Sequence, residues 1–103
     1  VEGLTVLGGE PFENPLGLLQ ALRNIKKEVS KSIWVYTGFV YDDLVSIALA
    51  REILEEIDVL VDGEFIEDLK DLSLRFRGSS NQRVIDVKKS LENNDIIILD
   101  GYK

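Results

Sequence analysis

Three short apolar runs, each closed by a glycine, constrain the fold of this chain more than any other feature. They are Leu4–Leu7, Ile33–Thr37 and Ile57–Asp62. Each is rich in β-branched, aliphatic or aromatic residues, a composition typical of strands that are buried on both faces of a parallel sheet. We therefore expect three buried parallel strands.

A helix is predicted between the first two strands. Asn14 is a suitable N-cap, Pro15 suits the first helical position, and apolar residues then recur at intervals of three and four. We expect this helix to end near Ser30.

A second helix is predicted between the second and third strands. Asp42 or Asp43 should start it, since a carboxylate both caps a helix and suits the positive end of its dipole. We expect it to continue without interruption and to close at Glu55 or Glu56.

The alternation of strands and helices sets the fold class. Short connections between strand, helix, strand, helix and strand require crossovers that make the sheet parallel and cover it with helices. We therefore expect an α/β fold with a parallel βαβαβ portion, in a single domain over residues 1–103. After Gly63 the pattern changes, and we expect extra C-terminal strands or extended segments at 72–77, 84–87 and 96–99.

Unusual residues follow all three predicted strands. The segments are Gly8-Gly9-Glu10-Pro11, Thr37-Gly38 and Asp62-Gly63. Each taken singly is more often a plain turn, but parallel strands bring their carboxyl ends to one rim, where ligands bind. Paired glycines allow close approach to main chain, and the carboxylates and hydroxyl can hold an ammonium group and ribose hydroxyls. The rim favours a zwitterionic, sugar-bearing small molecule.

Composition excludes several kinds of function. A net charge of −7 opposes nucleic-acid binding, and no apolar run approaches the length of a membrane span. The glycines form neither a dinucleotide fingerprint nor a phosphate-binding loop. Since no targeting segment is evident, we expect a cytoplasmic protein. The chain contains no cysteine and no histidine, so it offers no thiolate or imidazole to a metal.

Four motifs resemble a known family in order and spacing. The chain is similar to the activating proteins of anaerobic ribonucleoside-triphosphate reductase, which belong to the radical S-adenosylmethionine (SAM) superfamily. The similarity covers nearly the whole chain, and its last motif is more specific than its first. The motifs are Gly8-Gly9-Glu10-Pro11, 34–38, 58–63 and 76–87.

The resemblance implies a partial (β/α) barrel in which SAM binds at the rim above a 4Fe-4S cluster. Such oxidoreductases cleave SAM reductively, and the resulting radical takes a hydrogen atom from a glycine of the partner, the glycyl radical subunit of anaerobic ribonucleotide reductase. No catalytic side chain is assigned here. The residues expected to bind SAM are Gly8, Gly9, Glu10, Thr37, Asp62 and Arg83, the last through the SAM carboxylate unless it holds the partner.

One departure from the family limits what this chain can do. Family members hold the cluster with a Cys-x-x-x-Cys-x-x-Cys loop upstream of the Gly-Gly-Glu-Pro strand, and nothing here corresponds to it. We expect the chain to be the C-terminal portion of such an enzyme, a truncated barrel inactive by itself. Its first strand would then be an edge available for pairing with a second copy.

Two other interpretations remain open. The chain could be a non-catalytic binding module that kept the rim after losing the cluster. It could also be an unrelated doubly wound α/β domain, for example receiver-like, with Asp62 as a phosphoacceptor. The acidic cluster that a receiver needs for Mg²⁺ at the end of its first strand is absent from the sequence.

Overall fold

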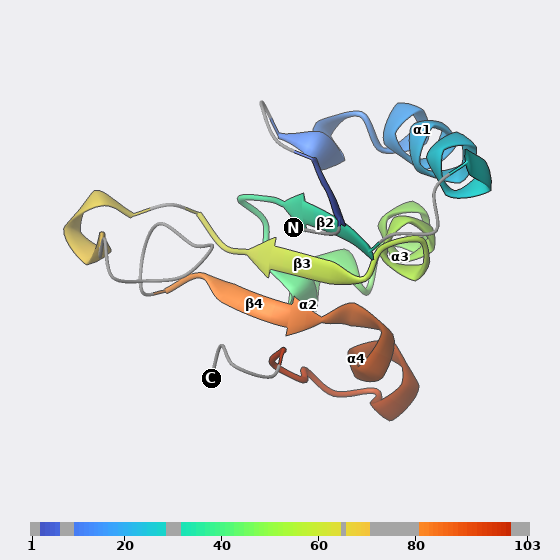
Figure 1. Cartoon of the computed structure of the whole chain (residues 1–103). Helices are drawn as coiled ribbons and strands as arrows, with labels where there is room; N and C mark the ends of the chain where they lie inside the picture. Colours follow the sequence, from blue (N-terminus) through green and yellow to red (C-terminus); the bar gives the residue numbers. More distant parts are fainter. Residues whose placement is uncertain (1–2, 7–9, 29–31, 65, 71–80, 100–103) are drawn as a thin grey trace.

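The computed structural model describes residues 3–6, 10–28, 32–64, 66–70 and 81–99 (Figure 1). Strands and helices alternate through most of these ranges. In chain order the elements are β1 (Gly3–Val6), the 3-10 helix η1 (Pro11–Glu13), α1 (Pro15–Glu28), β2 (Ser32–Tyr36), α2 (Tyr41–Leu44), α3 (Ala48–Glu55), β3 (Val59–Asp62), the 3-10 helix η2 (Glu67–Leu69), β4 (Arg83–Asp86) and α4 (Val87–Asn93).

The four strands form one sheet in the order β1-β2-β3-β4. The first three are parallel, with Val6 opposite Val35 and Val35 opposite Leu60, whereas β4 runs antiparallel to β3. The predicted α/β class and the predicted parallel strands are confirmed.

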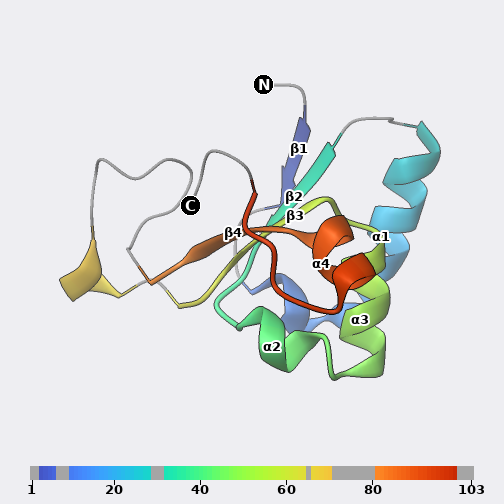
Figure 2. The same cartoon turned by 90° about the horizontal axis from the view of Figure 1, so that it is seen from below.

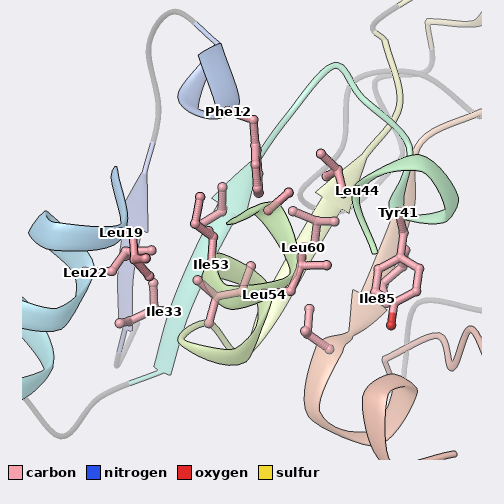
Figure 3. Close-up of a cluster of buried hydrophobic side chains, with 14 residues drawn as sticks. Phe12, Leu19, Leu22, Ile33, Tyr41, Leu44, Ile53, Leu54, Leu60 and Ile85 are labelled. Atoms are coloured by element: carbon pink, nitrogen blue, oxygen red, sulfur yellow. The ribbon is translucent and has the colours of Figure 1, made fainter. Parts of the chain in front are cut away.

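Helices cover one face of this sheet (Figure 2). The strand residues that face them are buried, as are the helix residues Leu22, Ile53 and Leu54 that meet them in the main core (Figure 3). Side chains alternate along a strand, so every second residue points the other way. The strand residues in the main core are Ile33, Val35, Leu60 and Ile85.

The opposite face carries a second, smaller apolar cluster. Val59, Val61 and Val84 are buried there, with Trp34 and Tyr36 packed against them. Because β3 is buried on both faces, its sequence shows a continuous apolar run rather than an alternation.

The predicted start of α1 is confirmed. Pro15 opens the helix, and the Asn14 side-chain oxygen accepts a hydrogen bond from the Gly17 amide at 3.4 Å. The helix is described as far as Glu28, so its predicted end near Ser30 lies outside the described residues.

The second predicted helix ends at Glu55 as predicted, but the prediction is wrong in two other respects. The chain forms two helices, α2 and α3, and Val40 rather than either aspartate holds the N-cap position of α2. The Ser46 hydroxyl donates to the Asp43 carbonyl at 2.8 Å, an acceptor that a continuous helix would use for its backbone. Asp42 and Asp43 lie within the first turn of α2 instead.

The C-terminal expectations are met in part. β4 is a strand, but the expected extended segment ends at Asp86, because that carboxylate accepts a bond from the Lys89 amide at 3.1 Å and caps α4. The run 96–99 forms an isolated bridge, between Ile98 and Ile85, rather than a strand. Segment 72–77 lies outside the described residues.

Candidate functional site at the strand ends

The Glu10 side chain joins the region after β1 to the end of β2. One carboxylate oxygen accepts hydrogen bonds from the Thr37 hydroxyl at 2.8 Å and the Phe12 amide at 2.9 Å. The other accepts from the Gly38 amide at 2.6 Å. Hydrogen bonds to ionised acceptors are stronger than neutral ones, so this carboxylate holds the two strand exits together.

Thr37 is buried, and its hydroxyl has two partners. While it donates to Glu10, it accepts a bond from the Phe39 amide at 3.1 Å. The Thr37 amide donates to the Val61 carbonyl at 3.0 Å, which ties the end of β2 to β3. Thr37 therefore connects Glu10, which follows β1 in the chain, to the carboxyl ends of β2 and β3.

Asp62 lies at the end of β3 with its side chain only 1% exposed. One carboxylate oxygen accepts from Arg83 Nε at 3.1 Å, and the other accepts from Arg83 Nη2 at 2.6 Å and from the Tyr41 amide at 2.8 Å. The Tyr41 amide is the first of α2, so Asp62 satisfies a helix donor that lacks an intrahelical partner.

Arg83 links three elements. From the start of β4 it pairs with Asp62 on β3, and its Nη2 also donates to Asp42 on α2 at 2.8 Å. Hydrogen bonding to Asp62 raises the pKa of Arg83 above its ordinary value, and the Arg83 bond lowers the pKa of Asp42 below its own. The guanidinium therefore stays charged.

An open cleft of about 620 Å³ lies at these strand ends. This volume falls within the roughly 300–1,000 Å³ of small-molecule sites. The lining residues include three acids and one arginine, so they carry a net negative charge that favours a cation. Its residues are Gly38, Val40, Asp42, Asp62, Gly63, Glu64, Ile66, Asn81 and Arg83.

Of the six predicted site residues, four are described. Asp62 and Arg83 line the cleft and bond to each other, and Glu10 bonds to Thr37 and to the cleft residue Gly38. Gly8 and Gly9 lie outside the described residues.

Sequence reasoning missed Asp42 and Glu64 as parts of this cleft. Asp42 was expected to cap a helix, and no role was assigned to Glu64 from the sequence. No short-range sequence pattern marks either residue as part of a cleft. Asp42 is placed there by its bond to Arg83, and Glu64 by the path of the chain after β3.

Aromatic residues after β2 lie in two different settings. The Tyr41 side chain is buried in the main core, and burial raises its pKa. Phe39 is 45% exposed and lines a separate apolar pocket with Phe12 and Ile47. Neither side chain lines the strand-end cleft.

The residues present do not fit an iron–sulfur cluster. Such clusters are held by cysteine thiolates, and none of the 103 residues is a cysteine. Within the described ranges, no group of three or more Asp or Glu residues is arranged to hold a metal ion.

No helix in the described part of the chain is long and apolar enough to cross a membrane.

Curated relatives carry one shared name. The chain is 43% identical over 86 residues to the anaerobic ribonucleoside-triphosphate reductase-activating protein of Escherichia coli K12, covering 81% of this chain and 54% of that protein. Proteins of the same name match at 44% over 84 residues in Pasteurella multocida and 45% over 85 residues in Haemophilus influenzae, each covering 79% of this chain and 53% of the relative. The chain thus spans about half the length of these relatives.

The motif resemblance to the activating proteins is therefore confirmed. The comparison with solved structures found no match. A family model described as "4Fe-4S single cluster domain" matches residues 1–85, which is most of the chain. The chain belongs to this 4Fe-4S single cluster domain family.

Proposed function

We propose that this chain is part of a radical SAM activase that generates the glycyl radical of anaerobic ribonucleotide reductase. The activity is the reductive cleavage of SAM, and the partner is the glycyl radical subunit of the reductase. Support comes from the shared name of relatives that are 43 to 45% identical. We expect the protein to act in the cytoplasm.

Sheet topology supports an origin in a (β/α) barrel. In a doubly wound sheet the strand order reverses and helices cover both faces. Here β1, β2 and β3 follow one another in sequence order, and the described helices lie on one face, as around a barrel (Figure 2). On this proposal residues 1–103 are one domain, a portion of such a barrel, and the receiver-like alternative loses support.

Asp62 is also poorly suited to be a phosphoacceptor. Its carboxylate is almost completely buried, and both of its oxygens accept hydrogen bonds from Arg83. A phosphoryl donor would have to displace this ion pair.

The single observation that carries SAM binding is the cleft at the strand ends. SAM bears a sulfonium and an ammonium group against one carboxylate, and a site for such a cation is favoured by Asp42, Asp62 and Glu64 around Arg83. On this proposal Gly8, Gly9 and Glu10 receive the ammonium group mainly through main-chain atoms. Thr37 and Asp62 hold the strand ends of the rim in place. Arg83 is the nearest cationic side chain for binding the SAM carboxylate.

Glu10 has a defined part in this arrangement. Since its side chain is held by Thr37, Gly38 and Phe12, it orients the peptide groups around it rather than reaching for the ligand. This chain has no thiolates, so its own residues offer no ligand to a cluster that would supply the electron for cleavage.

The complete gene product tests the proposal. We expect its coding region to include a cysteine-bearing segment in frame. After anaerobic cluster reconstitution, the protein should convert SAM to 5'-deoxyadenosine with a reductant and produce a glycyl radical signal in electron paramagnetic resonance with the reductase subunit. Absence of cysteine from the complete product would reject the activase and favour a non-catalytic binding module.

Pairing of two copies through β1 is a separate proposal. β1 lies at the edge of the described sheet, with β2 as its only neighbour there. An edge strand offers unpaired backbone groups to another chain. Sedimentation velocity over a concentration series should detect a homodimer, and a constant monomer mass would reject it.

A further inference from the structure

We propose that Asn81, Gln82 and Arg83 form a clasp, a set of side chains that positions the main chain at the floor of the strand-end cleft. This inference rests on the proposed function for its ligand. The hydrogen bonds that define the clasp do not depend on the identity of that ligand. The sequence resemblance gives no role to Asn81 or Gln82, and it assigns Arg83 only to the SAM carboxylate or to the partner.

Three consecutive side chains bind three consecutive residues, the last residue of β3 and the two that follow it, in antiparallel order. Arg83 takes the carboxylate of the last β3 residue, and the two amides each donate to a main-chain carbonyl. The bonds are Arg83 Nη2 to Asp62 at 2.6 Å, Gln82 Nε2 to the Gly63 carbonyl at 3.0 Å, and Asn81 Nδ2 to the Glu64 carbonyl at 2.8 Å.

These bonds begin where the backbone ladder stops. The last paired residues of the β3–β4 ladder are Asp62 and Arg83. Beyond that pair, side-chain amides replace backbone amides as donors to the two following carbonyls. Gly63 and Glu64 thus stay beside the start of β4 although neither belongs to a strand.

Gly63 is held from two sides. Gln82 donates to its carbonyl, and its own amide donates to the Phe39 carbonyl at 2.9 Å, on the segment after β2. Its φ of +96° lies in a region that L side chains rarely adopt. A Cβ there would still have room, since the nearest atom, Asn81 Nδ2, would be 3.5 Å away. Conformation rather than space requires glycine here.

The clasp consequently acts on both sides of the cleft. Through Gly63 it reaches the Phe39 carbonyl, whose neighbours Gly38 and Val40 line the cleft. Through Arg83 it reaches Asp42 on α2. We assign the three side chains as positioning residues for a cationic small molecule, and Asn81 and Arg83 also as residues that line the cleft.

The first test follows amide hydrogen exchange in this chain by NMR. Gln82→Ala should speed exchange of the Gly63 amide about tenfold, because losing one hydrogen bond loosens a local segment without unfolding the core. The Val35 amide in β2 should be unchanged. Asn81→Ala should have a smaller effect of the same pattern, since its bond is exposed.

Asn93→Ala is the matched control. Asn93 also donates its side-chain amide to a main-chain carbonyl, that of Lys89 at 2.7 Å, but it lies in α4. It should leave Gly63 exchange unchanged. Equal effects of Asn93→Ala and Gln82→Ala on Gly63, or no effect of Gln82→Ala, would overturn the clasp.

The second test measures SAM binding by the cluster-bearing complete protein. Gln82→Ala should raise the Kd for SAM about tenfold at unchanged iron content, while Asn93→Ala leaves it unchanged. Gln82→Asn, with a shorter amide side chain, should restore binding in part. An unchanged Kd in Gln82→Ala would reject the positioning role even if Gly63 exchange changes.

The two tests separate this inference from the proposed function. If SAM binds to none of the proteins, including the unsubstituted one, while the Gly63 exchange pattern is as expected, the proposed ligand is wrong and the clasp geometry stands. If SAM binds equally well to all variants, the ligand is right and the clasp does not position it.

Discussion

The strand-end rim holds two carboxylates in different ways. Glu10 is half-buried and receives its hydrogen bonds from two main-chain amides and the Thr37 hydroxyl, all neutral donors. Asp62 is almost completely buried and receives two of its three bonds from the charged Arg83. The more deeply buried acid is thus the one with a cationic partner.

Desolvation explains the difference. A buried charge is costly unless it is paired and hydrogen-bonded, whereas a partly solvated carboxylate is satisfied by dipoles alone. Because Arg83 also binds Asp42, the Asp62 end joins three elements, while the Glu10 end joins two strand exits. A substitution that removes the Asp62 contacts should therefore destabilise more of the structure than one that removes the Glu10 contacts.

The largest effect is expected from Arg83→Met, which keeps much of the apolar stem and removes the charge. It leaves the Asp62 carboxylate buried with a single donor, the Tyr41 amide. Removing one partner of a buried ion pair should lower the free energy of unfolding by about 3 kcal/mol. Urea denaturation monitored by circular dichroism measures this.

Arg51→Met serves as the control for that substitution. Arg51 pairs with Glu55 at 3.9 Å on the surface of α3. Loss of an exposed pair should cost only about 0.4 kcal/mol. Similar losses for the two variants would contradict the account of Asp62 as a buried acid that needs a cation.

At the Glu10 end, Thr37→Val tests the neutral donors. The variant keeps the shape and removes the hydroxyl bond to Glu10, so the free energy of unfolding should fall by about 2 kcal/mol. Thermal unfolding gives the value, and Thr37→Ser, which restores a hydroxyl, should recover most of it. A loss in Thr37→Val as large as that in Arg83→Met would remove the distinction between the two ends.

A smaller effect is expected from Gly63→Ala. Space is sufficient, but φ is +96°, so strain should lower the free energy of unfolding by about 1 kcal/mol. Gly17→Ala is a poor control because a Cβ there would meet the Asn14 amide nitrogen at 2.7 Å. Gly38→Ala, whose added Cβ would meet Glu10 Oε1 at 3.4 Å, is the better comparison. A higher free energy of unfolding in Gly63→Ala than in the unsubstituted protein would contradict the inference of backbone strain at this position.

The smallest effect concerns pH and Asp42. Its pKa lies below the ordinary 3.8 because Arg83 donates to it, so its contribution to stability is present above that value and is lost as pH falls through the lower, folded-state pKa. The side chain is 61% exposed, so Asp42→Asn should cost only about 0.5 kcal/mol at neutral pH. Urea denaturation at neutral pH and at a pH below the folded-state pKa of Asp42 should show that difference vanish in acid. A difference that persists in acid would contradict the ion pair.

Strands and helix starts were predicted correctly where a single short-range sequence pattern determines them. The three strands and the Asn14-Pro15 helix start follow from short-range composition, and the structure has them. The break between α2 and α3 could not be predicted, because apolar residues continue through it. The Ser46 hydroxyl donates to the Asp43 carbonyl at this break. Helix α4 was missed because Asp86 caps it directly after a strand.

Contacts at the rim depend on long-range geometry. Parallel order predicted that Glu10, Thr37 and Asp62 would follow neighbouring strands, and Glu10 does bond to Thr37. The partners of Asp62 could not be predicted, since Arg83 comes 21 residues later and reaches it through an antiparallel strand. Sequence alone therefore indicated the rim but not how its charges are paired.

Calorimetric titration of SAM into two proteins tests the central claim most directly. Under the proposed function, this rim supplies one part of a SAM site, and the rest requires a cluster that this chain has no cysteine to bind. This proposal predicts no measurable binding heat with the 103-residue chain alone and clear binding with the cluster-reconstituted product of the complete gene. Tight binding of SAM to the chain alone would contradict it.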